Sequence, residues 1–325
     1  MLAYIVRRIL YAIPILVGVN ILTFALFFGI NSPDDMARMH LGTKRVTQEA
    51  IDAWKRERGY DKPLFWNSDA KGEDKFTETI FFTKSISLFL FQFGHADDGR
   101  DIGHDLRTRM WPSLAIAAPI FIGGLLVNTT FALLMVFFRG TYLDLGGVVL
   151  CVALMSISTL FYVIMGQYLV GKLMHLVPVS GYVGGLDAFK FIILPIIIGI
   201  ISGIGAGARW YRTLFLEEVG KDYVRTARAK GLSEFKVLFK HILKNALIPI
   251  LTGAVVILPT LFLGSLILES FFGIPGLGSY TIDAIQAQDF AIVRAMVFLG
   301  SVLYILGLIL TDISYTLVDP RVRLN

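Results

Sequence analysis

The stretch EEVGKDYVRTARAKGLSEFKVLFKHILKNALIP, residues 217–249, is a polar interruption between two long hydrophobic runs. Residues 222–230 consist mostly of good helix formers. Gly231 favours a left-handed helix stop, and Ser233 with Glu234 after it favours the N-terminus of a second helix. The pattern predicts a short helix–Gly–helix hairpin held between two membrane spans, where it would be a rigid handle on both.

The second predicted helix is amphipathic. Its lysines recur at i, i+4 spacing on one face, and its larger apolar side chains lie on the other. The lysines are Lys236, Lys240 and Lys244, and the apolar residues are Phe235, Leu238, Phe239 and Ile242. Charge alone favours a simpler alternative, a solvated basic loop that obeys the positive-inside rule. The helical pattern lowers the weight of that alternative only modestly.

The hairpin sequence is similar to that of a known family. Residues 222–233 (DYVRTARAKGLS), followed by His241, 245–247 (NAL) and 248–249 (IP), resemble the cytoplasmic EAA-type loop of ABC importer permeases of the oligopeptide/dipeptide/nickel family. The resemblance implies that this loop docks into an ATPase subunit as a coupling helix. The implied ATPase-coupling residues are Tyr223, Arg225, Thr226, Ala227, Lys230, Gly231, Leu232 and Ser233.

The hairpin departs from the general family pattern at two places. Arg225 and Thr226 occupy the first two positions of a pattern that otherwise starts with glutamate, and Lys244 lies near the position of its proline. Such departures are usual in the peptide subfamily. They therefore narrow the assignment to that subfamily more than they weaken it.

The composition is that of a polytopic membrane protein. Of the 325 residues, 55% are hydrophobic and 17% are charged, and the mean hydropathy is +0.67. A soluble domain would carry about a quarter charged residues. Cys151, the single cysteine, falls in an apolar run and is predicted to be a packed thiol. No nucleic-acid partner is indicated, because the basic residues are not interleaved with exposed aromatics.

Six apolar runs are long enough to cross about 30 Å of hydrocarbon, given some tilt and snorkelling. They are residues 9–30, 112–138, 145–171, 191–208, 246–268 and 290–311. The first run follows Arg7 and Arg8 and exceeds the length of a signal-peptide core, so it is predicted to be retained. The sequence thus predicts an all-α polytopic membrane protein with six transmembrane helices.

The distribution of positive charge predicts the orientation. Alternation of the spans puts Arg139, the polar loop 212–249 and the Arg321/Arg323 tail on the side of Arg7 and Arg8. By the positive-inside rule that side is the cytoplasm, and both termini lie there. The predicted segments are a lead and first span (1–30), an extracytoplasmic region (31–111) and a five-helix permease core (112–325). The loop 212–249 connects the fourth span to the fifth.

The region 31–111 is predicted to contain one clear helix, at residues 46–58. Thr47 is its expected cap, Ile51 and Trp54 form an apolar stripe, and Gly59 ends it. The aromatic segment 79–93 is too short to span comfortably, so it is expected to lie on the membrane surface or to pack against the spans. In the fourth span, Gly199, Gly203 and Gly207 form a smooth face that predicts close helix packing.

The GIPGLG segment, residues 273–278, cannot continue a helix and predicts a tight outer re-entrant turn. Together with Glu269 and Phe272 it matches the string Glu-x-x-Phe-x-x-Pro-Gly-Leu-Gly that the resembling family has at this place. The resulting hypothesis is that Glu269, Phe272, Pro275 and Gly276 shape an outer gate.

No catalytic, metal-binding or cofactor-binding residues are predicted. The five histidines are scattered, and a nucleophile, base and orienting acid cannot be assembled. Residues 166–173 approach a phosphate-binding loop, but Leu173 replaces the Ser/Thr and the segment lies in a span. A membrane-embedded enzyme is therefore disfavoured. The main alternative, a channel or secondary transporter with a merely topogenic basic loop, would need ionisable residues at span centres, where there are almost none.

The resemblance covers nearly the whole chain. Further matching segments are Arg7–Arg8 with the first span, 61–64 (DKPL), 139–144 (RGTYLD), 176–181 (LVPVSG) and 319–324 (DPRVRL). The long outer region resembles the first of the two permeases in such systems. The implied partners are a homologous second permease, two ABC ATPases that carry the ATP and Mg, an extracytoplasmic binding protein and membrane lipid. The implied location is the bacterial inner membrane, and the implied mechanism is alternating access, with di/oligopeptides the commonest cargo and nickel complexes another.

Overall fold

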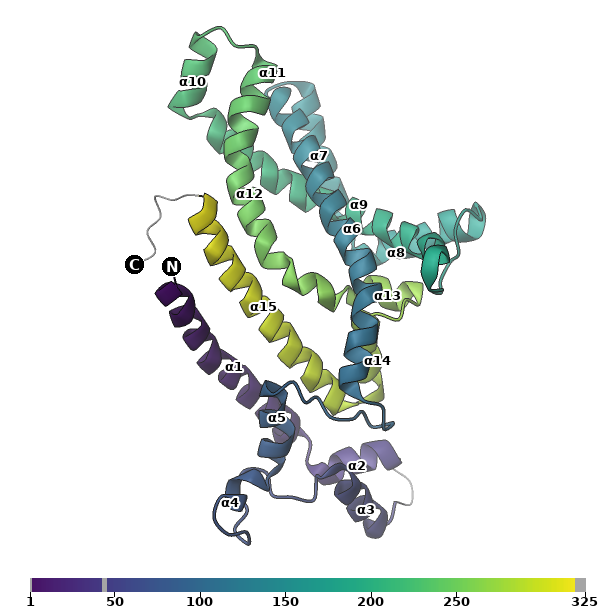
Figure 1. Cartoon of the computed structure of the whole chain (residues 1–325). Coiled ribbons are helices and arrows are strands. Elements are labelled where there is room, and N and C mark those ends of the chain that lie inside the picture. Colours follow the sequence, from purple (N-terminus) through teal and green to yellow (C-terminus); the bar gives the residue numbers. More distant parts are fainter. Residues whose placement is uncertain (1, 43–45, 319–325) are drawn as a thin grey trace. The chain divides into compact units, whose positions relative to one another are not determined.

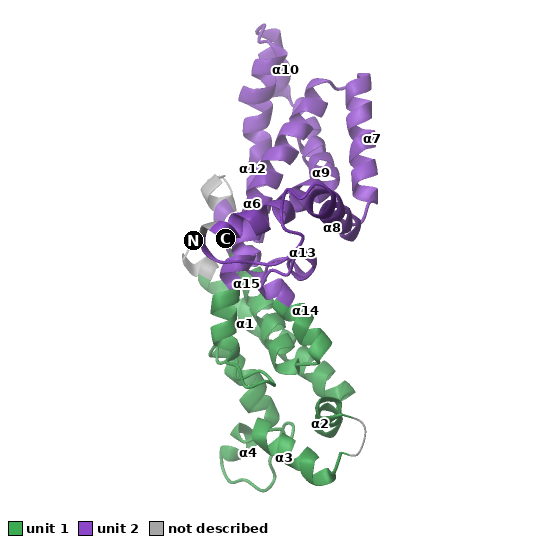
Figure 2. Ribbon diagram, turned by 90° about the vertical axis from the view of Figure 1, so that its right-hand side faces the viewer, with its two compact units in different colours: residues 1–109, 280–309 green, residues 110–279, 310–325 purple. Residues whose placement is uncertain are grey.

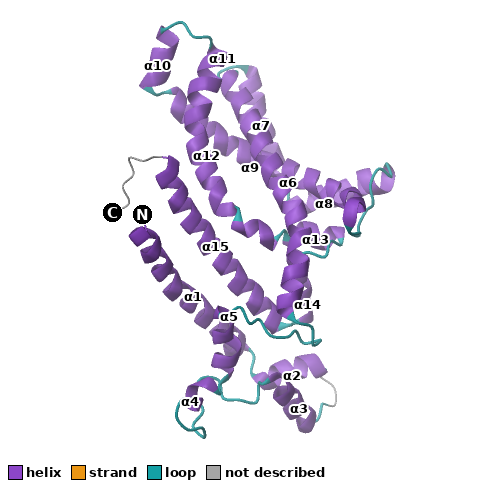
Figure 3. Ribbon diagram, viewed as in Figure 1, coloured by secondary structure: helices purple, strands orange, loops and turns teal. Residues whose placement is uncertain are grey.

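The computed structural model describes residues 2–42 and 46–318, so the predicted tail motif 319–324, with Arg321 and Arg323, lies outside the described residues. The described residues form helices and loops and no strand (Figure 3). The chain divides into two compact units (Figure 2). Unit 1 comprises residues 1–109 and 280–309, and unit 2 comprises residues 110–279 and 310–325.

Within residues 2–42 and 46–318, five helices are long and apolar enough to cross a membrane, or up to seven if each of two bent pairs counts as one span. Labelled as in Figure 1, they lie in α1 (Leu2–Ile30), α6 (Ile102–Phe137), α9 (Ala188–Val219), the continuous helix Glu234–Ile257 and α15 (Phe290–Val318). Four of the predicted runs match α1, α6, α9 and α15. The prediction of an all-α polytopic membrane protein is confirmed at this level.

The third predicted run, 145–171, is not one helix. It is divided between α7 (Tyr142–Ser156), α8 (Thr159–Gly166) and η2 (Gln167–Leu173), and the two halves bend by 85°. The break lies at Ile157 and Ser158, which both adopt extended backbone conformations. The Ser158 hydroxyl accepts a hydrogen bond from the Phe161 N–H, so it caps α8 and starts a new helix inside the apolar run.

The fifth predicted run, 246–268, is displaced. Its helix begins earlier, at Glu234, and runs through α11 (Glu234–Lys236), η4 (Val237–Ile242) and α12 (Leu243–Ile257). The run then breaks at η5 (Pro259–Leu263) and at Gly264, whose φ of +68° suits glycine. The chain continues in α13 (Leu266–Phe272) and α14 (Leu277–Ala287), and the pair η5–α13 and α14 is bent by 68°.

Unit 1 packs short helices of the region 31–111 beside α1 and α15. These are α2 (Pro33–Leu41), α3 (Gln48–Arg58), α4 (Asp74–Thr77), η1 (Phe82–Ile86) and α5 (Ser87–Phe89). The helix predicted at 46–58 is confirmed as α3: Thr47 caps it, Gly59 ends it in the left-handed region, and Ile51 and Trp54 are buried.

The aromatic segment 79–93 packs against the apolar helices, which is one of the two placements predicted for it. The Asn20 side chain on α1 donates to the Ser85 carbonyl at 2.9 Å. The Phe89 and Phe298 rings contact each other with their centroids 5.2 Å apart.

In unit 2 the small residues of α9 allow close packing, but not along the whole predicted face. A Cβ at Gly199 or Gly207 would collide with a side chain of α6, whereas a Cβ at Gly203 would meet nothing within 4 Å. At Gly205 the neighbour is backbone: a Cβ there would lie 2.5 Å from the carbonyl oxygen of Cys151 on α7. The Cys151 thiol is buried, as predicted.

Candidate functional sites

The predicted hairpin is present in unit 2. α10 (Asp222–Ala229) ends before Gly231, which has a φ of +76°, and the next helix starts at Glu234. The Ser233 hydroxyl accepts from the Lys236 N–H at 3.5 Å, as expected of an N-cap. The Gly231 N–H donates to the Arg228 carbonyl at 2.9 Å. A Cβ at Gly231 would meet nothing within 4 Å, so the backbone conformation and not space favours glycine there.

The inner face of the hairpin belongs to the core of unit 2. Val224 and Ala227 of α10 are buried in one cluster with Val237, Leu238 and Ile242 of the second helix. Ala227, predicted to contact an ATPase, therefore faces inward and anchors α10.

Only half of the predicted apolar face of the second helix is buried. Leu238 and Ile242 are buried, but the Phe235 and Phe239 side chains are exposed by 59% and 44%. The physical reason is the π-helical segment Val237–Ile242, whose wider turn rotates the register and brings Val237 inward in place of the phenylalanines. The two rings contact each other instead, with centroids 4.4 Å apart. The three lysines are exposed, as predicted.

The outer face of the hairpin carries most of the predicted coupling residues. Those that are exposed are Arg225, Thr226, Lys230, Gly231 and Ser233, and those that are half-buried are Tyr223 and Leu232. Within the described part of the chain, Arg225 has one ion-pair partner, the exposed Asp222, at 3.5 Å. The surface offered to solvent is thus small, basic and set on a buried support.

Polar contacts tie the hairpin to the long helices beside it. The Tyr223 hydroxyl donates to Glu218 at the end of α9, and Asn245 on α12 also hydrogen-bonds it. Burial and the Glu218 carboxylate raise the pKa of Tyr223 to about 12, so the hydroxyl stays protonated at neutral pH. These contacts link α10 to both α9 and α12.

The two arms of the hairpin are joined by an ion pair. The Arg228 guanidinium donates two hydrogen bonds to Glu234, at 2.7 and 3.1 Å, across the Gly231 turn. These bonds hold the pKa of the Glu234 carboxyl below its ordinary value. Because a depressed carboxyl pKa stabilises the folded state only while the group is ionised, the contribution is complete above about pH 5 and declines below about pH 4.

We expect a double-mutant cycle of Arg228→Ala and Glu234→Ala to give a coupling energy of at most about 1 kcal/mol at pH 7, because the Glu234 side chain is 62% exposed. Thermal unfolding of the purified permease in detergent measures it. The coupling energy should shrink when the cycle is repeated near pH 3. An equal value at both pH values would contradict this assignment.

A second ion pair in unit 2 was not anticipated. Arg212 on α9 donates to both carboxylate oxygens of Asp144 on α7, at 2.9 Å each, and the Gly140 N–H donates to the same carboxylate at 3.2 Å. Asp144 belongs to the segment 139–144 that resembles the family. Its partner is 68 residues away in sequence, so no local spacing indicates the pair.

Glu269 lies at the centre of the predicted outer turn. Its side chain is fully buried, and its carboxylate accepts backbone N–H groups from Ser265 (3.1 Å), Gly278 (2.7 Å) and Ser279 (3.1 Å). The Ser113 hydroxyl of α6 also hydrogen-bonds this carboxyl group. The same hydroxyl accepts from the Leu277 N–H at 2.7 Å. Glu269 thus holds together both sides of the break between α13 and α14.

The other predicted gate residues surround this carboxylate unevenly. Phe272 and Gly276 are buried, whereas Pro275 is exposed. A Cβ at Gly276 would overlap the Glu269 carboxylate, so only glycine allows the turn to close over it. Gly273 ends α13 in the left-handed region, which confirms that the helix stops at this segment.

Residues 108–324 match the family described as binding-protein-dependent transport system inner membrane component, and residues 1–87 match the N-terminal region of such membrane components. The chain belongs to this family. The match spans the hairpin and the Glu269 turn, and it confirms the resemblance to ABC importer permeases. The protein is accordingly a multi-pass inner membrane permease, because the members of this family are membrane components of transport systems.

Two similar proteins are named as permeases of peptide transport systems. The chain is 32% identical over 362 residues to the di/tripeptide transport system permease protein DppB of Pseudomonas aeruginosa (strain UCBPP-PA14), with 99% of each chain covered. It is 29% identical over 361 residues to the dipeptide transport system permease protein DppB of Escherichia coli (strain K12), again with 99% of each covered.

Proposed function

We propose that this chain is one permease subunit of an ATP-driven, binding-protein-dependent importer of di- or oligopeptides that works by alternating access. The partners would be a homologous second permease, two ABC ATPases on the cytoplasmic side and an extracytoplasmic binding protein. The family supports the transport role, and the names of the full-length relatives support the peptide cargo. ATP and Mg would be held by the ATPases.

The hairpin is the observation that carries the proposal. It offers a small basic surface, with Arg225 and Lys230 exposed, on a support that is buried and ion-paired. An ATPase that closes on ATP would push this surface. Because the hairpin connects α9 to the helix Glu234–Ile257, the push would shift two long helices between alternative packings.

The proposed topology has six crossings with both termini in the cytoplasm. The crossings would be α1, α6, the bent pair α7–α8, α9, the helix Glu234–Ile257 and α15. The second bent pair would be a re-entrant turn on the outer side. This count keeps the hairpin on the side of Arg7, Arg8 and Arg139, in accord with the positive-inside rule.

The proposal is tested by co-purification in mild detergent. The double variant Arg225→Glu/Lys230→Glu should lose the ATPases and ATP-dependent peptide uptake, because it reverses the charge of the exposed surface without touching the buried face. The matched control is Arg56→Glu/Lys71→Glu, which makes the same charge change at exposed residues of unit 1. The control should keep both the ATPases and uptake.

Two results would contradict the proposal. One is retention of the ATPases and of uptake in the hairpin variant. The other is a wild-type subunit that binds no ATPase yet transports alone in liposomes, which would favour a secondary transporter with a topogenic basic loop.

A further inference from the structure

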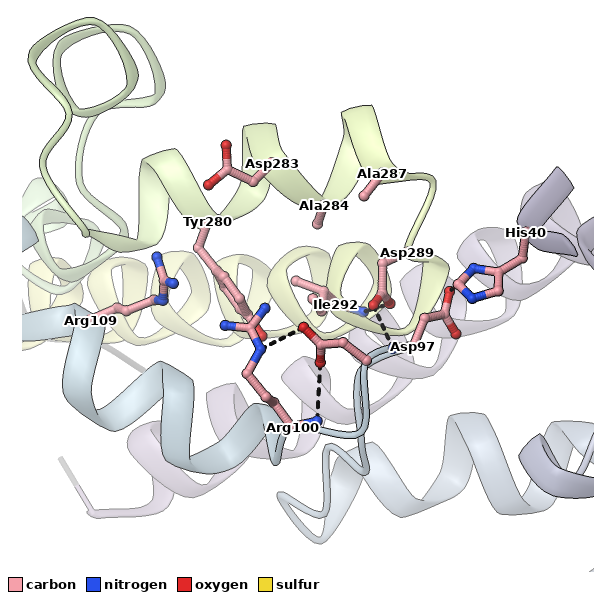
Figure 4. Close-up of a pocket in the computed structure, with 11 residues that line it drawn as sticks. His40, Asp97, Arg100, Arg109, Tyr280, Asp283, Ala284, Ala287, Asp289 and Ile292 are labelled. Carbon is pink, nitrogen blue, oxygen red and sulfur yellow. Dashed lines mark hydrogen bonds and ion pairs between the residues drawn. The ribbon is translucent and has the colours of Figure 1, made fainter. Parts of the chain in front are cut away.

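A charged cavity of about 310 Å³ lies within unit 1 (Figure 4). Its walls come from α14, the beginning of α15, the segment 97–100, the N-terminal part of α6 and the last turn of α2. Its charged lining consists of Asp97, Asp98, Asp283, Asp289, Arg100 and Arg109, with His40 at one end. The volume is at the small end of ligand-binding pockets, enough for one long side chain.

The walls of this cavity are held in place by hydrogen bonds. The Asp97 N–H donates to the Asp289 carboxylate at 2.7 Å. The other oxygen of Asp289 accepts the N–H groups of Ala291 and Ile292, both at 3.1 Å, and so caps the start of α15. Arg58 lies 3.2 Å from the Asp97 carboxylate. The acidic side chains are therefore preorganised.

The cavity carries an excess of negative charge. With the charged groups that contact the lining included, five aspartates (Asp97, Asp98, Asp105, Asp283 and Asp289) face four arginines (Arg58, Arg100, Arg109 and Arg294), which leaves one negative charge with His40 neutral. The two arginines of the lining are already engaged: Arg100 pairs with Asp98 at 2.6 Å, and the Arg109 guanidinium lies 4.6 Å from the centroid of the Tyr280 ring. Asp283 is exposed at the rim, with no ion pair among the residues described.

The cavity also has an unused polar group. The Tyr280 side chain is 2% exposed, and its hydroxyl lies near Asp105 without a hydrogen bond of good geometry among the described residues. Figure 4 shows this ring extending from α14 toward Arg100. Burial and the neighbouring Asp289 raise the pKa of Asp97, against the effect of Arg58 and His40. An additional cation would relieve that repulsion.

We propose that this cavity receives a lysine or arginine side chain of the extracytoplasmic binding protein when that protein docks on the permease. A long side chain with a cationic end matches both the volume and the negative excess, and its N–H groups can donate to the aspartates and to the Tyr280 oxygen. The inference rests on the proposed function and topology, which put the region 31–111 and the turn between α14 and α15 on the outer side.

The test measures binding of the purified, peptide-loaded binding protein to the complete transporter in nanodiscs. Asp283→Lys should weaken binding at least about tenfold at low salt, with a smaller effect at high salt, because it places a like charge at the mouth of the cavity. Glu78→Lys makes the same charge change at an exposed residue outside the cavity and should leave the affinity unchanged.

Basal ATPase activity without the binding protein separates this inference from the proposed function. It should be unchanged in Asp283→Lys, whereas a complex that never contains ATPases would refute the proposed function itself. Replacing the lysine or arginine of the binding protein that enters the cavity by glutamate should restore binding to Asp283→Lys. The same replacement should weaken binding to the wild-type permease. An unchanged affinity of Asp283→Lys overturns the inference. A loss of affinity seen only when the bound peptide has a free amino terminus also overturns it, because the cation in the cavity would then belong to the peptide and not to the binding protein.

Discussion

Replacing Gly231 by proline is expected to abolish ATP-dependent uptake while the subunit still inserts into the membrane. Gly231 has a φ of +76°, and its N–H donates to the Arg228 carbonyl. Proline fixes φ near about −65° and has no N–H, so it cannot adopt this turn and should destabilise it by more than about 1 kcal/mol. The two arms would separate, and the Arg228–Glu234 pair would be lost with them. The long apolar helices, which decide insertion, are not altered.

The measurement compares peptide uptake per inserted subunit in vesicles for a series at this position. Gly231→Asn is the matched control, because asparagine tolerates the left-handed region and a Cβ at this position meets no atom within 4 Å. It should retain most of the uptake. Gly231→Ala should lie between the two. Uptake by the proline variant at the wild-type level would show that the hairpin does not couple the ATPases to the spans.

Capping residues and glycines predicted the helices whose ends depend on neighbouring residues. The hairpin and α3 were both located from a capping residue at one end and a glycine at the other, and the structure has Ser233, Gly231, Thr47 and Gly59 in those roles. Such signals act within one turn of helix, so they can be read from neighbouring residues alone.

Span boundaries were less predictable because an apolar run reports burial in lipid and not the continuity of a helix. The run 145–171 contains a bend at Ser158, whose hydroxyl caps a new helix. The run 246–268 contains a turn at Gly264. The helix Glu234–Ile257 also starts inside the polar stretch, because its first turns pack on the core of unit 2 and not in lipid.

Contacts between distant residues were beyond prediction for a different reason. Asp144 and Arg212 are both visible in the sequence, but only the packing of α7 on α9 brings them together. The cavity lined by Asp97, Asp283 and Asp289 likewise combines segments nearly 200 residues apart. The π-helical register that exposes Phe235 has no recognised signal in composition.

Removing the Glu269 carboxylate is expected to destabilise the Glu269 turn more than any other single truncation in it. Glu269→Ala leaves the N–H groups of Ser265, Gly278 and Ser279 without their acceptor in a buried site. An unsatisfied buried donor costs about 1–3 kcal/mol, so the expected loss in the free energy of unfolding is several kcal/mol. Glu269→Gln keeps the shape and one acceptor oxygen, and its loss should be smaller.

Thermal unfolding of the purified permease measures this order of stability. Ser270→Ala is the matched control, because Ser270 is the next residue of α13 and its buried hydroxyl has no hydrogen-bond partner among the described residues. It should unfold near the wild-type temperature. A Glu269→Ala variant as stable as Ser270→Ala would show that water replaces the carboxylate at no cost, and the bracing role of Glu269 would be wrong.

Uptake per folded complex then separates bracing from the outer-gate hypothesis. If Glu269 only braces the turn, Glu269→Gln should transport normally once its lower abundance is corrected for, because the folded turn keeps its shape. If the turn must open and close between states, the weakened hydrogen bonds to Gly278 and Ser279 should change the equilibrium between those states. Uptake would then fall per folded complex, or basal ATPase activity would rise without transport. Glu269→Gln with normal uptake and normal ATPase coupling would rule the gate out.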